Sequence, residues 1–323
     1  MSYTAKGYLI AITGIILWST TGVFIGYLIT HYNMPPLLLA FWRNLFVCAA
    51  LVPALFLLRR SLLKIHHSQI WFYLFYGLVL ALFNSIWVLS VQANGAAVAT
   101  VLAYSSAGFT AILALWLFKE KLGPPKITAV LLSLIGCVLV SQAYRADMWR
   151  LNPLGISTGL LSGALFAGYT LLGKEAARRE INVWTSLLYS FAFGSLFILI
   201  FNLFPVLPGS AGSYANLFPA LPVSGWLTLI FLSLVPTVLG FGLYNMSMNY
   251  LPASITNLLA TTEPAMTALE AYIFLNERMT MIEIIGGLII LSAVFIVQFE
   301  KEESGPRSNH AAKRQPNRAQ TSS

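Results

Sequence analysis

The sequence predicts an all-α membrane protein with ten transmembrane helices, arranged as two inverted repeats of five helices. Three observations support this fold class. Apolar residues make up 58% of the 323 residues and charged residues only 9%, and the mean hydropathy is +0.76, which is far from the composition of soluble proteins. The apolar residues are grouped into segments of membrane-spanning length. One long segment also occurs twice along the chain.

The hydrocarbon core of a bilayer requires about 20 apolar residues in a helix that crosses it. The first segment is too long for a cleaved signal peptide and lacks a small-residue cleavage site, so we expect it to stay in the membrane. The predicted spans are residues 7–29, 37–58, 71–91, 96–118, 127–145, 153–173, 184–204, 225–247, 255–275 and 282–299. The uncharged, proline-rich segment 202–225 is either an outer loop on the headgroups or a mobile cover over an outward mouth.

An internal duplication relates the two halves. AAVATVLAYSSAGFTAILALWLFKEKL (96–122) recurs as ASITNLLATTEPAMTALEAYIFLNERM (253–279), with Glu120 matching Glu277. Because five spans form each copy, the second copy must cross the membrane in the opposite sense. Inverted repeats of this kind are typical of secondary transporters with a site near the bilayer midplane. We predict repeats at 1–146 and 147–300, followed by a disordered cytoplasmic tail at 301–323.

The positions of the basic residues predict the orientation of the chain. If the N-terminus is inside, most of the 19 Lys and Arg residues flank the inner ends of spans. Only Arg145, Arg150 and Arg278 then lie outside, and Arg43 lies within the second span. The positive-inside rule therefore places both termini in the cytoplasm. This topology explains the net charge of +8 without a nucleic-acid partner, and we expect a bacterial inner (plasma) membrane location.

Motifs of other function classes are missing from the sequence. Cys48 and Cys137 are isolated within spans and the four histidines lie in loops or the tail, so we expect neither a disulfide framework nor a metal site. No Walker sequence, nucleophile elbow or dinucleotide-binding glycine fingerprint is present. We expect no enzyme activity and no cofactor. The expected partners are a small-molecule substrate and the lipid bilayer, and an oligomer is not required.

Three ionisable residues lie well inside the spans, where such groups are functional candidates because they are costly in hydrocarbon. At 1.5 Å per residue, Arg43 and Glu270 lie about 9 Å and 8 Å below the outer surface, and we predict that they form an ion pair. Glu263 lies near the midplane, and we predict that it contacts the substrate or the coupling ion. The alternative is one fixed polar cluster of these residues with Thr261 and Thr262.

Pro264 predicts a break in the ninth span. Its ring nitrogen cannot donate a hydrogen bond to the carbonyl of Ala260, so the helix should kink or open beside Glu263. The freed carbonyls suit a proton, a cation or a polar substrate group. A kink that only serves packing is the alternative.

Aromatic and small polar residues in several spans predict an amphipathic pocket for a small organic solute. The alternative is that these aromatic residues belong to the core. The candidate substrate-binding residues are Trp18, Thr20, Trp87, Tyr104, Tyr169, Tyr244 and Asn245. Glycines four residues apart are expected to let helix backbones approach closely. They are Gly155, Gly159 and Gly163 in the sixth span and Gly22 and Gly26 in the first.

Four stretches carry a resemblance to a known family: LWSTTGVF (17–24), LLAFWRN (38–44), YNMSMNYLPAS (244–254) and TEPAMTALEAYIFLNER (262–278). They resemble EamA-type transporters of the drug/metabolite transporter superfamily, which are ten-helix secondary carriers. The resemblance implies small metabolites as substrates, often efflux, and a central cavity between the halves. The chain departs from the family pattern at SSAG (105–108), where a proline-containing turn is common, and at Glu270.

The predicted function is therefore a secondary active transporter that exports a small organic metabolite or drug-like solute by alternating access. Proton coupling through Glu263 is one option that the sequence leaves open. The alternative function is a channel-like protein or a scramblase without ion coupling.

Overall fold

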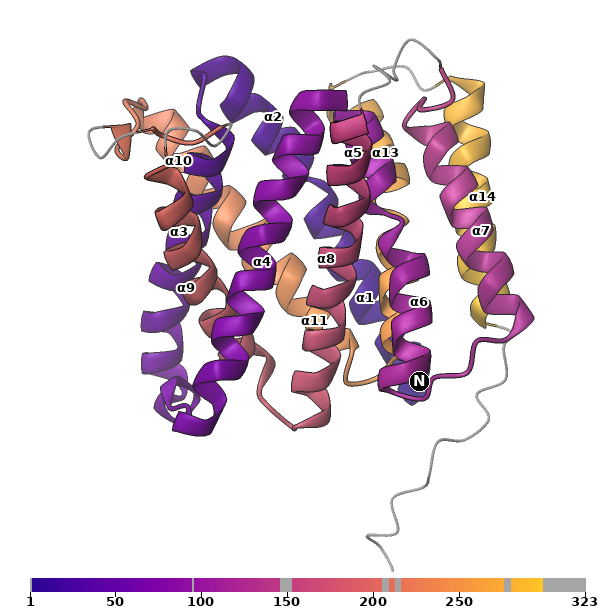
Figure 1. Ribbon diagram of the computed structural model, residues 1–323, viewed down its shortest axis with the longest axis horizontal. Helices are drawn as coiled ribbons and strands as arrows, with labels where there is room; N and C mark the ends of the chain where they lie inside the picture. Colours follow the sequence, from indigo (N-terminus) through magenta and orange to yellow (C-terminus); the bar gives the residue numbers. More distant parts are fainter. Residues whose placement is uncertain are drawn as a thin grey trace, which may run out of the picture.

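The structure is a computed structural model in which residues 2–94, 96–145, 153–204, 209–212, 216–275 and 280–298 are described. These residues form a bundle in which most helices lie roughly parallel or antiparallel to one another (Figure 1). The predicted boundary at 146/147, Glu277, Arg278 and the tail 301–323 lie outside the described residues.

The helices of the first half form five segments, joined by short connections. They are α1 (Tyr3–Ser19) with α2 (Thr21–Tyr32), α3 (Pro36–Leu58), α4 (His67–Asn94), α5 (Ala96–Ala103) with α6 (Ser106–Leu117), and α7 (Pro124–Val140). A single turn of 3₁₀-helix, η1 (Arg60–Leu63), connects α3 to α4.

The helices of the second half also form five segments. They are α8 (Pro153–Arg178), α9 (Val183–Asn202), α10 (Val223–Leu232) with the π-helix η4 (Ser233–Phe241) and α11 (Gly242–Ser247), α12 (Ala253–Ala260) with α13 (Glu263–Leu275), and α14 (Met281–Gln298). The ten segments agree with the ten predicted spans to within a few residues at most ends. The π-helix was not predicted, because the hydrophobic pattern of the eighth span does not distinguish helical pitches.

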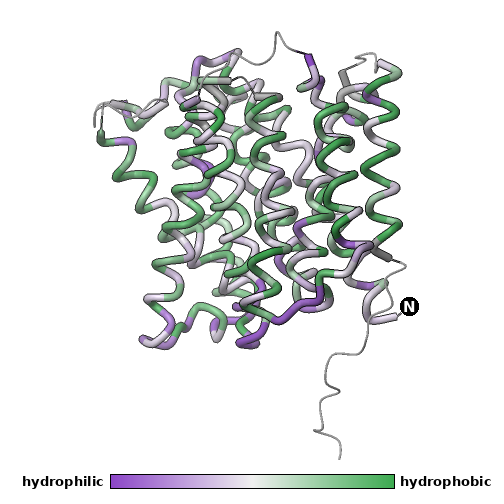
Figure 2. The backbone as a smooth tube through the Cα atoms, turned by 45° about the vertical axis from the view of Figure 1, so that its right-hand side comes forward, coloured by the Kyte–Doolittle hydropathy of each residue, from purple (hydrophilic) through white to green (hydrophobic). Residues whose placement is uncertain are grey.

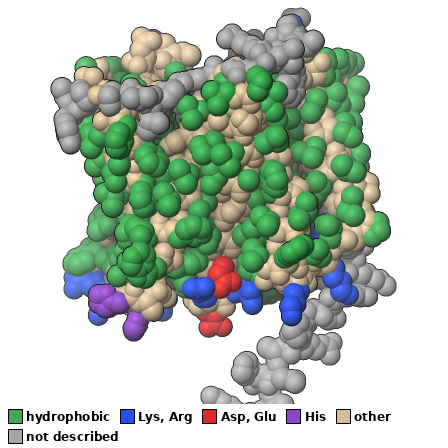
Figure 3. All heavy atoms as spheres, in the orientation of Figure 1, with side chains coloured by type: hydrophobic (Ala, Val, Ile, Leu, Met, Phe, Trp, Pro, Cys, Tyr) green, Lys and Arg blue, Asp and Glu red, His purple; other side chains and the backbone are tan. Residues whose placement is uncertain are grey.

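The surface of the bundle is that of a multi-pass membrane protein. Seven segments are long and apolar enough to cross a membrane, and α7 and most of α14 form shorter apolar helices. Large apolar side chains such as Leu58 (83% exposed) and Trp116 (79% exposed) point outward. Figure 3 shows apolar side chains over the middle of the visible face, with Lys, Arg, His and Glu at its lower end. Hydrophilic segments gather at the same end in Figure 2, where the N-terminus also lies.

Three of the described segments contain a break in the α-helix near mid-length. The first is interrupted at Thr20, the fourth at Tyr104 and Ser105, and the ninth at Thr261 and Thr262. Pro264, which the sequence predicts to interrupt the ninth span, lies in the first turn of α13, where a proline disturbs no hydrogen bond. The fourth segment has no proline, yet it breaks at the residues that match Thr261 and Thr262 in the repeat.

The glycine motifs of the first and sixth spans differ in their packing. A Cβ atom on Gly159 would lie 2.6 Å from Leu102, and one on Gly163 would lie 2.4 Å from Ser105 Oγ, so close packing of α8 against the fourth segment is confirmed. The same prediction is wrong for Gly22 and Gly26 in this conformation, because a Cβ atom on either would meet nothing within 4 Å. Glycine spacing permits close approach but does not enforce it.

The described parts of segment 202–225 are fixed to the N-terminal part of α3. Asn202 Nδ2 donates to the carbonyl of Leu37 (3.0 Å), and its Oδ1 accepts from the amide of Ala211 (3.0 Å). Trp42 Nε1 donates to the carbonyl of Leu217 (2.8 Å). These contacts favour a fixed outer loop over a mobile cover for the described residues.

Candidate functional site

Aromatic side chains from both halves meet at the centre of the bundle. The Trp18 ring lies 5.6 Å from Phe166, 4.7 Å from Phe241 and 5.5 Å from Tyr244, measured between ring centroids. All four side chains are buried. We call these four residues the aromatic centre. It joins α1 of the first half to α8, η4 and α11 of the second, so a movement of one half relative to the other must rearrange it.

A hydrogen-bonded network of buried polar side chains surrounds this centre. Asn245 Nδ2 donates to Tyr169 Oη (3.0 Å), and Asn245 Oδ1 accepts from Tyr76 Oη (3.2 Å). The amide thus ties α11 to α8 and α4 at once. Buried polar groups are stable only when they are paired, so this arrangement fixes the three helices relative to one another.

A second part of the network links α8 to the broken segments. Asn257 Nδ2 donates to Thr170 Oγ1 (2.9 Å), which also lies 2.9 Å from Tyr244 Oη. Ser106 Oγ donates to Asn257 Oδ1 (3.0 Å). Asn257 is not among the candidate residues predicted from the sequence. The sequence indicates it only by an amide side chain within an apolar span.

Glu263 lies where the broken fourth and ninth segments face each other. It is the first residue of α13, and its Oε2 accepts a hydrogen bond from Tyr104 Oη, at the break of the fourth segment. Cys137 Sγ lies 3.5 Å from the carbonyl of Thr261, one of the carbonyls at the break. The contact between Tyr104 and Glu263 therefore joins the two halves at the places where each backbone is interrupted.

The structure does not bring Arg43 and Glu270 into the predicted ion pair. Arg43 Nη2 donates to Asn84 Oδ1 on α4 (3.1 Å), and Ser19 Oγ donates to Glu270 Oε1 (2.6 Å). The ion pairs within 4.0 Å between described residues are those of Glu175 with Arg178 and Arg179. Depth in the bilayer can be counted along a helix, but the direction in which each side chain points cannot.

Two candidate residues lie apart from the aromatic centre. Thr20 Oγ1 donates to the carbonyl of Leu17 in its own helix (2.7 Å), which satisfies a carbonyl next to the break in the first segment. Trp87 is half-buried on α4, and none of the ring contacts or hydrogen bonds between described residues joins it to the centre.

The end of the bundle that carries the basic residues is closed by polar contacts between the halves. Glu120 Oε1 accepts from the amide of Ala253 (2.7 Å), and Glu120 Oε2 accepts from the amide and the hydroxyl of Ser254. Within the second half, Lys174 Nζ donates to the carbonyls of Met248 and Leu251, both at 2.7 Å. A carboxylate on the first amides of α12 is favoured by the helix dipole. Every residue of α12 is buried.

One face of the first segment contacts the ninth segment. Ile15 belongs to a core cluster with Leu258 and Leu259, and Ser19 bonds Glu270, so this face of the first segment meets the ninth. Gly22 and Gly26 continue the same face at helical spacing. Nothing lies within 4 Å of their Cβ positions, so these two glycines pack against no neighbouring helix.

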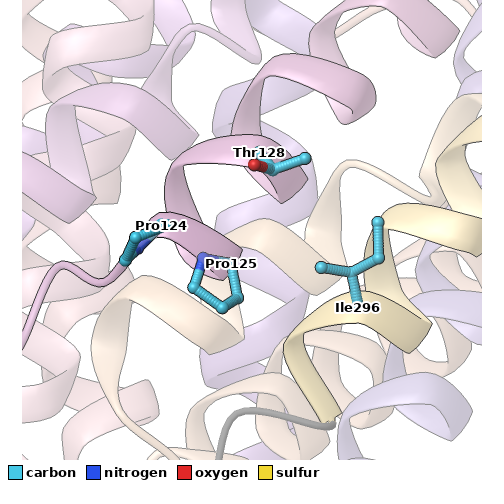
Figure 4. Close-up of a pocket in the computed structure, with 4 residues that line it drawn as sticks. All are labelled: Pro124, Pro125, Thr128 and Ile296. Carbon is cyan, nitrogen blue, oxygen red and sulfur yellow. The ribbon is translucent and has the colours of Figure 1, made fainter.

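A shallow apolar hollow lies elsewhere, between the first turn of α7 and the end of α14. It is lined by Pro124, Pro125, Thr128 and Ile296 (Figure 4). None of these residues belongs to the polar network. Among the described residues, no group of three or more His, Cys, Asp or Glu side chains is placed to hold a metal ion.

Comparisons with known proteins agree with this architecture. The chain is similar to the "Uncharacterized inner membrane transporter YicL" of Salmonella typhimurium (strain LT2), with 28% identity over 93% of this chain and 97% of that protein. It is also similar to the "Threonine/homoserine exporter RhtA" of Salmonella typhimurium (strain SL1344), with 28% identity over 68% of each. A crystal structure with 19% identity matches 91% of this chain and 96% of its own at a TM-score of 0.74, which shows the shared fold.

The family model of the EamA-like transporter family matches residues 5–142 and again residues 153–299. The two matches cover both halves of the bundle, and the family is one of transporters rather than enzymes. The chain therefore belongs to the EamA-like transporter family.

Proposed function

We propose that the protein is a secondary active transporter that exports a small amino-acid-like metabolite by alternating access, coupled to protons through Glu263. Its two halves, 1–146 and 147–300, act as inverted repeats in the plasma membrane, with both termini in the cytoplasm. The orientation is supported by the basic residues at the end of the bundle where the chain begins (Figure 3).

The contrast between the two ends of the bundle carries this proposal. At the basic end, Glu120 of the first half binds Ala253 and Ser254 of the second. At the other end, Gly22 and Gly26 of α2 have no atom within 4 Å of their Cβ positions. In an inverted repeat, the contacts made at one end have counterparts that form at the other end. Alternate closing of the two ends around the aromatic centre would give each side access to one site.

The assignment of Glu263 is supported by its surroundings. An apolar setting favours the neutral form of a carboxyl, whereas the first turn of a helix and a tyrosine donor favour the ionised form. These opposed influences suit a group that takes up and releases one proton per cycle. Because its partner Tyr104 belongs to the other half, a change of protonation acts directly on the contact between the halves.

The substrate class is supported by the relative that exports threonine and homoserine, and by the amphipathic lining of the centre. The test uses purified full-length protein in vesicles loaded with L-threonine. We expect saturable counterflow of labelled L-threonine and, with an imposed pH gradient, accumulation against its concentration gradient. Flux that does not saturate and shows no counterflow would instead indicate a channel-like protein.

A further inference from the structure

We infer that Glu270 is a second proton-binding group of the transporter, and that its protonated carboxyl holds α13 against the break in the first segment. Glu263 remains the first such group. This inference rests on the proposed coupling to protons, and it names the residue that a proton arriving from the outer side meets first.

The Ser19 hydroxyl lies between two acceptors. Its Oγ is 2.7 Å from the carbonyl oxygen of Ile16 and 2.6 Å from Glu270 Oε1, and Ser19 is buried. A hydroxyl has one proton to donate and two lone pairs that can accept. Ser19 can therefore donate to only one of the two oxygens at a time. The second contact becomes a hydrogen bond when the carboxyl supplies a proton of its own.

The two protonation states of Glu270 give two arrangements of this contact. An ionised Glu270 takes the Ser19 proton, and the Ile16 carbonyl loses that donor. A protonated Glu270 donates from Oε1 to Ser19 Oγ, and Ser19 then donates to Ile16. Uptake of one proton thus forms both hydrogen bonds at the observed distances.

The surroundings of Glu270 favour the neutral carboxyl. Its Oε2 is buried without a hydrogen-bond partner, which costs more for a charged group than for a neutral one. Its side-chain hydrogen bond is the one with Ser19, and the ion pairs between described residues do not include it. A lone negative charge inside a membrane is expensive, so proton uptake relieves this cost.

No counter-charge comes from the helices packed against α13, which are α1, α2, α7 and α14. α13 itself carries Glu263, a second carboxyl, and Tyr272. The titratable groups on the four neighbouring helices are Tyr3, Lys6 and Tyr8 on α1, Tyr27, His31 and Tyr32 on α2, Lys126 and Cys137 on α7, and Glu283 on α14. Within the described part of the chain, none of them forms a hydrogen bond, an ion pair or a ring contact with Glu270.

Both carboxyls of α13 meet hydroxyl groups at breaks in the first half. Glu263 and Glu270 are seven residues apart, so they share one face of the helix and lie about 10.5 Å apart along its axis. Tyr104 bonds Glu263 at the fourth segment, and Ser19 bonds Glu270 at the end of α1. Thr267 lies between the carboxyls, and its Oγ1 donates to the Ser19 carbonyl (3.2 Å). Protonation of each carboxyl therefore acts at one break.

The two carboxyls are arranged in series from the outer side. α12 begins beside Glu120 at the basic end, and α13 lies toward the opposite end (Figure 1), so Glu270 is farther from the basic end than Glu263. A proton that enters from outside meets Glu270 first. The step is a proton transfer from hydronium to Oε1, in which one O–H bond forms and one water molecule is released. The Ser19 proton then turns from Glu270 to Ile16.

Infrared difference spectroscopy tests this proton site without transport. Purified full-length protein is titrated with acid, and the carbonyl band of each newly protonated carboxyl is recorded. We expect Glu270→Gln to lose one band of the parent and Glu263→Gln to lose another. Glu175→Gln, which replaces a carboxylate paired with arginines at the basic end, is the matched control and should keep both of these bands.

Ser19→Ala keeps the carboxyl and removes its partner. A carboxyl that donates a hydrogen bond has a lower carbonyl frequency than one that does not, so we expect the Glu270 band to move to higher frequency. Ser190→Ala is the control, because it removes a buried hydroxyl that donates to Leu187 in its own helix, and the band should stay in place. An unmoved band in Ser19→Ala overturns the contact with the first segment.

Counterflow of L-threonine tests whether the contact must be released in each cycle. The amide of Glu270→Gln donates to Ser19 at every pH, so α13 stays held against the break. We expect counterflow about 10-fold slower than in the parent, which corresponds to about 1.4 kcal/mol in the barrier. If Glu270→Gln does not fold, Glu270→Ala takes its place in the infrared test, where the same band should be lost.

The outcomes separate this inference from the proposed function. If the parent is driven by a pH gradient but the Glu270 variant keeps every carboxyl band, the second proton site is refuted and the transporter stands. Counterflow of Glu270→Gln at the parent rate overturns the requirement for release. If the band is lost but the parent shows no counterflow with any solute, the proposed function fails and the proton site stands.

Discussion

Tyr104 donates a hydrogen bond to Glu263, and this contact joins the break in the fourth helical segment to the break in the ninth. The two breaks occupy matching positions of the internal repeat. Each supplies one partner from a different half, so the bond spans the interface that must rearrange when the halves move. Its two residues are therefore the first to examine for coupling.

Glu263→Gln should separate exchange from coupling. The glutamine preserves the shape of the protonated carboxyl and still accepts a hydrogen bond from Tyr104, so we expect a folded protein that retains counterflow. Accumulation driven by a pH gradient should be lost, because no proton is taken up or released. Flux measured in vesicles with and without the gradient checks this. A variant with the pH profile of the parent would make Glu263 a structural residue.

Tyr104→Phe removes one donor from the carboxylate while keeping the ring. The loss of a hydrogen bond to a charged group costs about 1.5–3 kcal/mol, and here it falls on the ionised form of Glu263. We expect the pH dependence of driven flux to change, because Glu263 loses its partner in the other half. The matched control is Tyr73→Phe, which removes a buried hydroxyl on α4 that makes no contact with Glu263. An identical profile in both variants would speak against the role of Tyr104.

Glu120→Gln should loosen the basic end of the bundle. It removes the charge that binds the first amides of α12, a contact worth about 1.5–3 kcal/mol. We expect a cysteine placed at Ser254 to react faster with a thiol reagent applied from the cytoplasmic side, in a background with Cys48→Ser and Cys137→Ala. Glu175→Gln is the control. Unchanged reactivity would show that Glu120 does not hold this end closed.

Gly22→Ala and Gly159→Ala test the difference in packing between α2 and α8. On Gly159 the new Cβ meets Leu102 and Ser90 Oγ within 2.8 Å, so we expect a lower melting temperature. On Gly22 it meets open space, and the melting temperature should be unchanged or higher, since alanine favours a helix by up to about 1 kcal/mol. Transport by Gly22→Ala should nevertheless fall if α2 closes onto α13. Full transport would argue against such a closure.

A double-mutant cycle of Arg43→Met and Glu270→Gln should show little coupling in the absence of substrate. The two side chains share no hydrogen-bond partner and form no ion pair, and the effects of separate sites add to within about 0.5 kcal/mol. The free energy of unfolding of the four proteins gives the coupling. A value of several kcal/mol would reveal a direct contact in another conformation.

The sequence by itself determined the helices, their number and the family. Runs of apolar residues of bilayer length fix the spans, because every backbone polar group in lipid must be paired within a helix. Repeated segments and Pro264 also placed the break of the ninth segment. The fourth segment breaks at Tyr104 and Ser105 although it contains no proline. Only its match with the ninth segment in the internal repeat could have predicted this break.

The tertiary structure alone decided which polar groups meet. Arg43 and Glu270 share a depth, yet they bond to Asn84 and Ser19, because the direction of a side chain depends on how neighbouring helices are rotated and packed. The same holds for glycine: Gly159 and Gly22 belong to the same kind of motif, but a Cβ on Gly159 would meet Leu102, whereas one on Gly22 would meet no atom within 4 Å. Composition and periodicity act along one helix, whereas these contacts depend on the relative placement of several.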